Sequence, residues 1–415
     1  MASSVSATQT RADQRNAVLA GFLGWTLDAF DFFILVMVVP AVARDFHKSV
    51  PAIALTLTAS LVTRPLGAII FGVMADRWGR RLPLMIDVIF YSVVEVFSGL
   101  APTYKSFLLL RMLYGIGMGG EWGVGASLTM ESVPPKIRGI LSGLLQEGYA
   151  CGYLLAALAY YTVYPHWGWR PMFFIGGLPA LLSLFIRSKV KETEAWHQSR
   201  TDWKQYGRAM VANWRRFLYL VLLMAFMTSM SHGTQDMFPT FLTRQRHYSV
   251  NTVSVTTMVS MAGALIGGIV VGHLSDRWGR RRAMMTSITL ALLFVPLWVM
   301  APNLPAIMMG AFLMQFMVQG AWGVIPAHIN ELSPPQLRGF MPGFAYQMGI
   351  LCSSSIGYIE AAVGEHFSYS HAMAGAMIVV LLCLWVVVKL GPEAAGVAFV
   401  APKSEPAAGS APAPV

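Results

Sequence analysis

The sequence predicts an all-α integral membrane protein with twelve transmembrane helices in two pseudo-symmetric six-helix bundles. Three observations predict this fold class: an apolar composition, recurring apolar runs and an internal repeat. Of the 415 residues, 55% are hydrophobic and 12% are charged, which is too apolar for a soluble chain of this length. Each run approaches or exceeds the ~20 residues that cross a hydrocarbon core. The expected spans are residues 17–40, 52–75, 82–101, 106–131, 139–163, 170–187, 216–242, 250–274, 283–301, 304–331, 339–362 and 371–390.

The first apolar run follows Arg11 and Arg15 and precedes small residues at 41–43, as a signal peptide would. We interpret it as a transmembrane helix instead. A run of about two dozen residues that includes Asp28 and Asp31 is too long and too polar for the apolar region of a secretory signal.

Basic residues indicate the orientation of the chain. Lys and Arg gather before the first span and after every second span, in the segments that share one side of the membrane with the N-terminus. Because short cytoplasmic loops retain Lys and Arg, we expect both termini to be cytoplasmic, in a plasma or bacterial inner membrane. Membrane topology thereby accounts for the net charge of +10, and we expect no nucleic-acid partner.

Two sequence blocks recur at an offset of 200 residues. Residues 72–81 return as 272–281, and much of 120–139 returns as 320–339. Both blocks follow corresponding spans, so the pattern indicates a parallel duplication with six helices in each half. The expected organisation is a cytoplasmic N-terminus (1–16), an N-terminal bundle (17–187), a cytoplasmic linker with an amphipathic helix on the membrane surface (188–215), a C-terminal bundle (216–391) and a disordered cytoplasmic tail (392–415).

The repeated blocks resemble two motifs of the major facilitator superfamily. Gly-x-x-x-Asp-Arg-x-Gly-Arg-Arg at 72–81 and 272–281 resembles its signature loop, and Glu-x-x-Pro-Pro-x-x-Arg-Gly at 131–139 and 331–339 resembles its partner motif. The resemblance implies a cytoplasmic gate that locks the two halves in the outward-open state of a rocker-switch transporter. The alternative is that these are solvated loop charges that anchor the topology. The implied gate residues are Asp76, Arg80, Glu131, Arg138, Asp276, Arg280, Glu331 and Arg338.

Further stretches resemble one branch of that superfamily. Residues 24–33, with Gly-Gly-Glu-Trp-Gly at 119–123, are similar to the sialate and lactate proton symporters. Residues 231–240 resemble the Ser-His-x-Ser/Thr-Gln-Asp-x-x-x-Thr motif of lactate and pyruvate permeases, although Thr228 stands where those permeases have Asn. The resemblance implies proton-coupled import of a small monocarboxylate.

Ionisable residues inside the spans point to proton coupling. Counted from the loop edges, Asp28, Arg64 and Arg111 lie in one layer, roughly 18 to 21 Å from the cytoplasmic side at ~1.5 Å per residue. Asp28 and Asp31 share a helix face, and either one can pair with an arginine. We hypothesise that Asp28 or Asp31 carries the proton and that Arg111 couples it to the substrate anion. The alternative is a permanent structural ion pair.

Other polar residues extend this site. His232, Gln235 and Asp236 follow helical spacing and form one polar face, which either contacts substrate or satisfies itself between helices. Glu121 and Glu147 either relay protons or pair with neighbouring helices. Gln315 is expected to line the cavity, whereas Asp87 and Glu95 are expected to be structural. The predicted substrate-binding residues are Arg64, Arg111, His232, Gln235, Asp236, Gln319 and Gln347.

Several other function classes are disfavoured by the sequence. The pattern Gly115-x-Gly117-x-x-Gly120 matches a dinucleotide fingerprint, but it lies inside an apolar run and is interpreted as helix packing. We found no phosphate loop, metal-ligand spacing or hydrolytic triad, so we expect no metal, no cofactor and no enzyme activity. The predicted function is proton-coupled import of small organic anions, such as lactate or pyruvate, by a monomer. The alternatives are symport of a sialic, aromatic or dicarboxylic acid, and proton-antiporting export.

Overall fold

The computed structural model describes residues 10–200 and 202–400, and the regular elements in this part of the chain are helices. The N-terminal bundle contains α1 (Arg11–Asp45), α2 (Val50–Trp78), α3 (Arg81–Leu100), α4 (Tyr104–Ser132), α5 (Arg138–Gln146), α6 (Gly148–Thr162), α7 (Tyr164–Trp167), α8 (Arg170–Ile175) and α9 (Ala180–Lys189). The C-terminal bundle contains α12 (Trp214–Gln235), α13 (Phe238–Thr240), η2 (Phe241–Gln245), α14 (Val250–Trp278), α15 (Arg280–Val299), α16 (Leu304–Leu332), α17 (Met341–Ser353), α18 (Ile356–His366) and α19 (Tyr369–Leu390).

Short elements complete the chain. Two 3₁₀ turns, η1 (Pro135–Ile137) and η3 (Pro335–Leu337), follow α4 and α16 at equivalent places in the two halves. The linker between the bundles forms α10 (Glu194–Ser199) and α11 (Trp203–Ala212). Polar side chains cap the N-termini of many helices. The Thr10 side chain accepts a hydrogen bond from the Asp13 backbone N–H in a capping box, and the Asn303 side chain accepts one from the Ala306 N–H.

The twelve-helix prediction is confirmed, with irregularities that the periodicity does not show. Within the described ranges, nine helices or helix pairs are long and apolar enough to span a membrane. The fourth span, α4, is a continuous helix that carries internal charges. The fifth and eleventh spans are each divided into two helices, at Glu147 and at Ser354–Ser355. The seventh span breaks after Gln235, because Pro239 has no N–H to donate to the Gln235 carbonyl.

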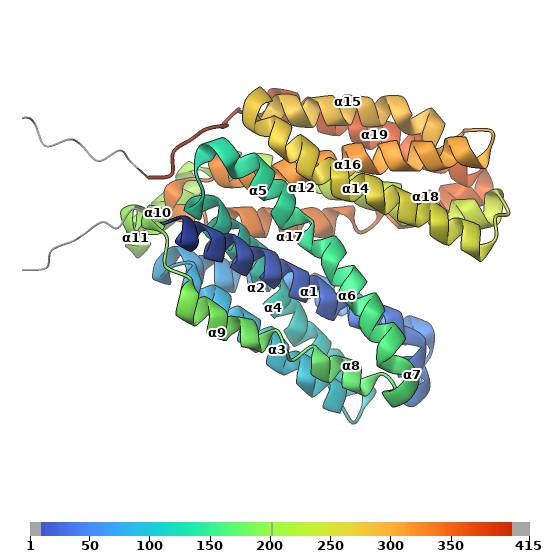
Figure 1. Ribbon diagram of the computed structural model, residues 1–415, viewed down its shortest axis with the longest axis horizontal. Coiled ribbons are helices and arrows are strands. Elements are labelled where there is room, and N and C mark those ends of the chain that lie inside the picture. Colours follow the sequence, from blue (N-terminus) through green and yellow to red (C-terminus); the bar gives the residue numbers. More distant parts are fainter. Residues whose placement is uncertain (1–9, 201, 401–415) are drawn as a thin grey trace, which may run out of the picture.

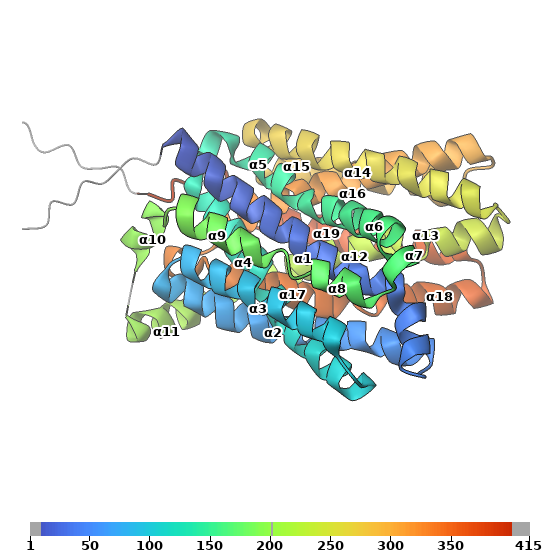
Figure 2. The same cartoon turned by 60° about the horizontal axis from the view of Figure 1, so that its bottom comes forward.

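Figures 1 and 2 show the two bundles side by side, with the described ends of the chain at the same end of the molecule. We call this end the terminal end. The bundles lie close together there and diverge towards the opposite end (Figure 1). Within each bundle, glycines allow close helix contact. A Cβ on Gly115 or Gly119 would lie only 2.1 or 1.9 Å from a backbone oxygen of α2, which confirms helix packing as the role of this stretch of α4.

The structure adds to three expectations about the chain outside the spans and corrects one of them, the disordered tail. Helix α1 begins at Arg11, so residues 11–16 of the expected cytoplasmic N-terminus are helical. The linker helices pack on the terminal end of the bundles, where Trp196 is buried. Residues 392–400 contact both bundles and are not a disordered tail, whereas residues 401–415 lie outside the described chain. For residues 392–400, contacts with Arg138 and Arg338 outweigh the disorder that the local composition favours.

Candidate functional site

The signature loops are built around two glycines in a left-handed conformation. Helix α2 ends at Trp78, and Gly79 has φ +98°, a value that side chains other than glycine rarely adopt. This turn directs Arg80 back along the helix, where its guanidinium lies 2.8 Å from Asp76 and 2.8 Å from Glu131 of α4. Gly279, with φ +89°, makes the equivalent turn in the second half.

Each signature aspartate binds the opposite bundle. Asp76 accepts hydrogen bonds from the backbone N–H groups of Gly339 (2.6 Å) and Phe340 (3.1 Å). Asp276 accepts them from Gly139 (2.7 Å) and the following residue (3.0 Å). A Cβ on Gly339 would approach the Asp76 carboxylate and the Arg80 guanidinium to 2.7 Å, so a larger residue would have to displace these side chains. The bonds are charge-assisted and cross the interface twice, by pseudo-symmetry.

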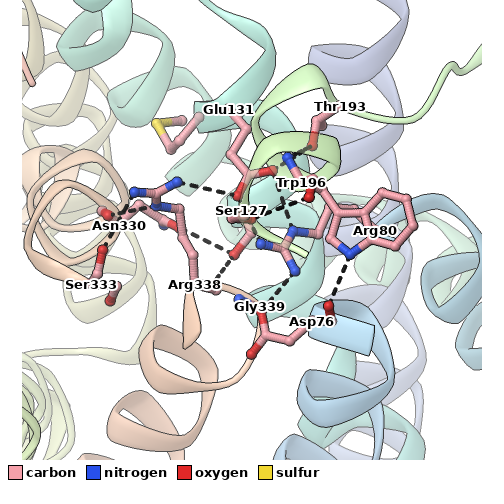
Figure 3. A network of polar contacts seen from close by, with 12 residues as sticks. Asp76, Arg80, Ser127, Glu131, Thr193, Trp196, Asn330, Ser333, Arg338 and Gly339 are labelled. Carbon is pink, nitrogen blue, oxygen red and sulfur yellow. Dashed lines mark hydrogen bonds and ion pairs between the residues drawn. The ribbon is translucent and has the colours of Figure 1, made fainter. Parts of the chain in front are cut away.

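Ion pairs also cross between the bundles. Arg138 lies 3.0 Å from Glu331, and Arg338 lies 3.6 Å from Glu131, with all four side chains buried (Figure 3 shows the second pair). Ser127 of α4 donates a 2.6 Å hydrogen bond to the Arg338 carbonyl. Burial lowers the pKa of Arg338 to about 10, against the effect of Glu131, so Arg338 remains charged at neutral pH. The structure thus brings together all eight residues predicted to form the gate, and we keep that name for them.

The linker adds residues to the gate that the sequence did not indicate. Thr193 donates a 2.5 Å hydrogen bond to Glu131, and the Trp196 indole donates one of 2.8 Å to the Asp76 carbonyl (Figure 3). Tyr206 of α11 donates one of 3.2 Å to the Asp76 carboxylate. The linker therefore contacts the gate directly.

An acidic residue after the last span of each half caps a helix of the same half. Glu192 accepts hydrogen bonds from two backbone N–H groups at the start of α3 (2.8 and 3.1 Å), and Glu393 accepts two at the start of α15 (3.2 and 2.9 Å). Burial alone would raise the pKa of Glu393, but hydrogen bonds from Arg281 and Ala395 hold it below its usual value. The sequence signal for this pair was the glutamate that follows the last span of each half.

The segment after Glu393 crosses the gate. The Phe399 ring lies between the guanidinium groups of Arg138 and Arg338, with ring-centre distances of 3.8 and 3.9 Å, and Arg138 also donates a 2.9 Å hydrogen bond to the Val397 carbonyl. One aromatic ring thus contacts a gate arginine of each bundle. Cation–π contacts of this kind stabilise the arrangement in which the terminal end is closed.

We expect Phe399→Ala to shift the protein towards the state in which the terminal end is open. Two lost cation–π contacts of about 0.5 to 1 kcal/mol each correspond to a change of roughly five- to thirty-fold in the ratio of closed to open molecules. Spin labels at Lys136 and Gln336, on either side of the gate, report this ratio as a distance distribution. Phe399→Tyr keeps the ring and should behave as the parent does; an unchanged distribution for Phe399→Ala would show that the ring does not stabilise closure.

The arginine of α4 has a different partner from the one expected. Arg111 pairs with Glu95 of α3 and donates a 2.7 Å hydrogen bond to Ser98, and its guanidinium lies 4.4 Å from the centre of the Tyr114 ring. All of these groups are buried. In this conformation the partner of Arg111 is therefore neither Asp28 nor Asp31, because α3 presents Glu95 to it directly. Glu95, which was expected to be structural, is the ion-pair partner of Arg111 here.

The two acids of α1 are fully buried beside this pair. Neither carboxylate of Asp28 or Asp31 has a hydrogen-bond partner among the described residues, and the same holds for Arg64 Nε and Nη2. Asp28 interacts electrostatically with Arg64, and Asp31 with Arg111 and Glu95. A buried ionised carboxylate without a partner is costly, so these two acids are places where a proton can bind.

Two further predicted acids are also buried without hydrogen-bond partners in the described chain. The Glu121 carboxylate faces Gly24, where a Cβ would lie 2.1 Å from its oxygen, and so it lies at the contact between α4 and α1. Glu147 lies at the break between α5 and α6 and faces Gly268 of α14 at the same distance. Glu147 thus extends from the first bundle to the second.

The polar face of α12 divides into two parts. The His232 ring lies 3.2 Å from Asp236, and both side chains are about half exposed. Gln235 instead donates a 3.1 Å hydrogen bond to Gln315, so this part of the face is satisfied between helices. Gln347 donates a 3.3 Å hydrogen bond to the Gly119 carbonyl across the bundle interface. Gln319 of α16 is partly buried.

Sequence reasoning missed two buried groups in the second bundle. Glu360 of α18 is 1% exposed and has no hydrogen-bond partner in the described ranges; one of its oxygens would lie 3.1 Å from a Cβ on Gly233. His328 of α16 is fully buried with both ring nitrogens unpartnered among the described residues. The only sequence signal was an ionisable residue inside an apolar run.

Comparisons with known proteins agree with this architecture. The sequence profile of the Major Facilitator Superfamily matches residues 21–245 and, again, residues 221–411. The chain is 29% identical to the probable 4-methylmuconolactone transporter of Cupriavidus pinatubonensis (93% of this chain, 92% of that one) and 28% identical to the sialic acid transporter NanX of Escherichia coli (82% and 85%). It is also 28% identical to a carboxylic acid transporter protein homolog of Saccharomyces cerevisiae. That match covers 88% of this chain but only 63% of the length of the yeast protein.

Solved structures share the fold at low sequence identity. The proton:xylose symporter XylE bound to 6-bromo-6-deoxy-D-glucose superposes with a TM-score of 0.76 at 17% identity, covering 92% of this chain and 97% of that one. The human organic anion transporter MFSD10 superposes with a TM-score of 0.70 at 15% identity, covering 90% and 99%. At these identities the likeness concerns the fold alone.

Proposed function

The chain belongs to the Major Facilitator Superfamily, and we propose that it is a proton-coupled symporter that imports small organic anions as a monomer in the cell membrane. The names of its relatives, which transport carboxylic acids, sialic acid or 4-methylmuconolactone, support an organic acid as substrate. The resemblance of residues 231–240 to lactate and pyruvate permeases supports a monocarboxylate.

The observation that carries proton coupling is the pair of unpartnered acids beside an arginine. Asp28 and Asp31 are fully buried. Arg111, which we expect to couple the proton to the substrate anion, is paired with Glu95. A proton on Asp28 or Asp31 removes the cost of a buried charge in this conformation. When a substrate carboxylate or one of these acids displaces Glu95 from Arg111, the proton balance of the cluster changes. Competition for one arginine thereby links the binding of protons to the binding of substrate.

The gate controls the conformational change that the transport cycle needs. Because Lys and Arg gather on the terminal side, we place this end and both termini in the cytoplasm. The conformation described here, with the gate closed, then corresponds to the outward-open state. Import requires the cross-bundle bonds of Asp76 and Asp276 to break while equivalent contacts form at the outer end. The duplicated gate is consistent with a rocking motion about the pseudo-symmetry axis.

Transport by purified protein in proteoliposomes tests this proposal. We expect counterflow of at least one labelled acid from a panel of lactate, pyruvate, nicotinate, muconate and sialic acid. For the acid that is carried, an inward proton gradient should produce accumulation. A gradient that drives the same acid outward would indicate an antiporting exporter instead, and flux without any response to the gradient would exclude coupling.

A further inference from the structure

A cluster of aromatic rings lies where the two bundles meet. Tyr346 of α17 is at its centre: its ring lies 4.4 Å from Trp122 of α4, 6.2 Å from Trp25 of α1 and 5.9 Å from Trp322 of α16. The Arg64 guanidinium lies 5.9 Å from the same ring. We call these five residues the aromatic cluster. Since its members come from both bundles, any rocking motion separates Tyr346 from Trp122 and uncovers their faces.

The polar atoms of the cluster are unusual for a packed core. Besides Nε and Nη2 of Arg64, the indole N–H groups of Trp25 and Trp322 are buried without hydrogen-bond partners in the described part of the chain. Trp122 provides an internal contrast, because its N–H donates a 3.2 Å hydrogen bond to Gln146. Buried donors are normally satisfied, so a set of unsatisfied donors around one group of rings indicates a ligand that accepts hydrogen bonds.

We propose that the aromatic cluster is the binding site for the substrate anion and that the preferred substrates are monocarboxylates with a flat aromatic or conjugated body. This inference rests on the proposed function and narrows its substrate class. The carboxylate pairs with Arg64, which is only 4% exposed and whose Nε and Nη2 have no hydrogen-bond partner among the described residues. The flat body stacks between Tyr346 and Trp122, in place of the contact that these rings make with each other.

The shape and chemistry of the cluster favour a planar ligand over a small hydroxy acid. Lactate would satisfy Arg64 but would leave the faces of the rings without a partner once the bundles separate. A planar ring covers both faces, and an acceptor atom on its edge can receive an indole N–H from Trp25 or Trp322. Arg111 is bound to Glu95 and Ser98 in this conformation, which leaves Arg64 as the arginine that the carboxylate meets first.

Binding of benzoate and cyclohexanecarboxylate to the purified protein, measured by calorimetry, tests the proposal directly. The two acids have the same charge and similar size, but only benzoate is flat and aromatic. We expect benzoate to bind about ten-fold more tightly, as stacking on one or two rings predicts. Tyr346→Leu should remove this preference, and Arg64→Gln should weaken the binding of both acids. Tyr160→Leu, which removes a stacked ring elsewhere on α6, is the matched control and should change neither.

A second readout does not depend on how the variants fold. Benzoate should quench the tryptophan fluorescence of the parent protein, and Trp122→Phe should reduce this quenching. Equal affinities for the two acids, or a preference that Tyr346→Leu leaves intact, would overturn the aromatic preference. If lactate is carried in proteoliposomes while benzoate does not bind, the substrate class is wrong and the proposed function stands. If no organic acid is bound or carried, the proposed function itself fails.

Discussion

Replacing both Asp28 and Asp31 with asparagine is expected to abolish accumulation of substrate while preserving exchange across the membrane. Asparagine keeps the size and neutral polarity of the protonated acid but cannot release a proton. The variant is therefore fixed in the state that a bound proton produces, in which substrate can still bind and exchange. Net transport coupled to protons requires the deprotonated state as well, and asparagine cannot reach it.

The measurement is a pH jump applied to proteoliposomes. With one proton per monovalent anion, a gradient of about one pH unit supports roughly ten-fold accumulation, because one unit corresponds to about 1.4 kcal/mol. We expect the parent to approach this value and the double variant to reach a ratio of about one. The single variants show which acid carries the proton, since only the carrier is indispensable. If Asp28→Asn and Asp31→Asn both still concentrate substrate, the assignment is wrong and Glu95 becomes the next residue to test.

Asp45→Asn is the matched control for this experiment. Asp45 ends α1 at the end of the first bundle opposite the terminal end, where it lies 2.9 Å from Arg170, and both side chains are partly exposed. Exposed ion pairs of this kind contribute little. The control therefore applies the same substitution, on the same helix, to an acid outside the buried cluster, and it should retain full accumulation.

The second large effect is expected at the gate, where Asp76→Asn should open the terminal end. The carboxylate accepts two short backbone hydrogen bonds from the opposite bundle and contacts Arg80. An amide retains only one oxygen, loses the charge and places an NH₂ group against a donor. Hydrogen bonds to a charged group contribute about 1.5 to 3 kcal/mol each, so we expect a shift of about 3 kcal/mol, or roughly a hundred-fold in the ratio of closed to open molecules.

Labels at Lys136 and Gln336 report this shift in a background without Cys151, Cys352 and Cys383. Adding Asp276→Asn removes the pseudo-symmetric contact and should populate the open state almost completely. Although burial opposes the charged form, Glu131 and Asp76 raise the pKa of Arg80 above its usual value, so Arg80 remains a charged partner of Asp76 in the parent protein near neutrality. Distances in Asp76→Asn that match those in the parent would mean that the gate is not what closes this end.

Much of the architecture could be predicted because it depends on local sequence. Apolar runs report the cost of placing each residue in a bilayer, which adds up along a segment. The geometry of the signature loops also follows from local sequence. Gly79 makes the turn at positive φ, and Asp76 and Arg80 meet because they are four residues apart around the helix end. Duplication then placed Gly339 and Gly139 opposite the two aspartates.

Charge pairing inside the membrane could not be predicted in the same way. Asp28, Arg64 and Arg111 were expected in one layer, but the layer does not specify which acid faces which arginine. Arg111 pairs with Glu95 because of how α3 is rotated against α4, and that rotation follows from contacts such as Gly117 against Tyr91. The rotation of one helix against another cannot be inferred from an apolar run.

The sequence by itself determined the twelve spans, the duplication and the eight residues that meet at the terminal end. Only the tertiary structure decided that Glu95 holds Arg111, that Glu393 and Phe399 attach the end of the chain to the gate, and that Tyr346 joins rings of both bundles around Arg64. The physical reason is the same in each case. Insertion and helix formation are sums over neighbouring residues, whereas ion pairs, ring contacts and unsatisfied donors depend on how helices distant in sequence are rotated and packed.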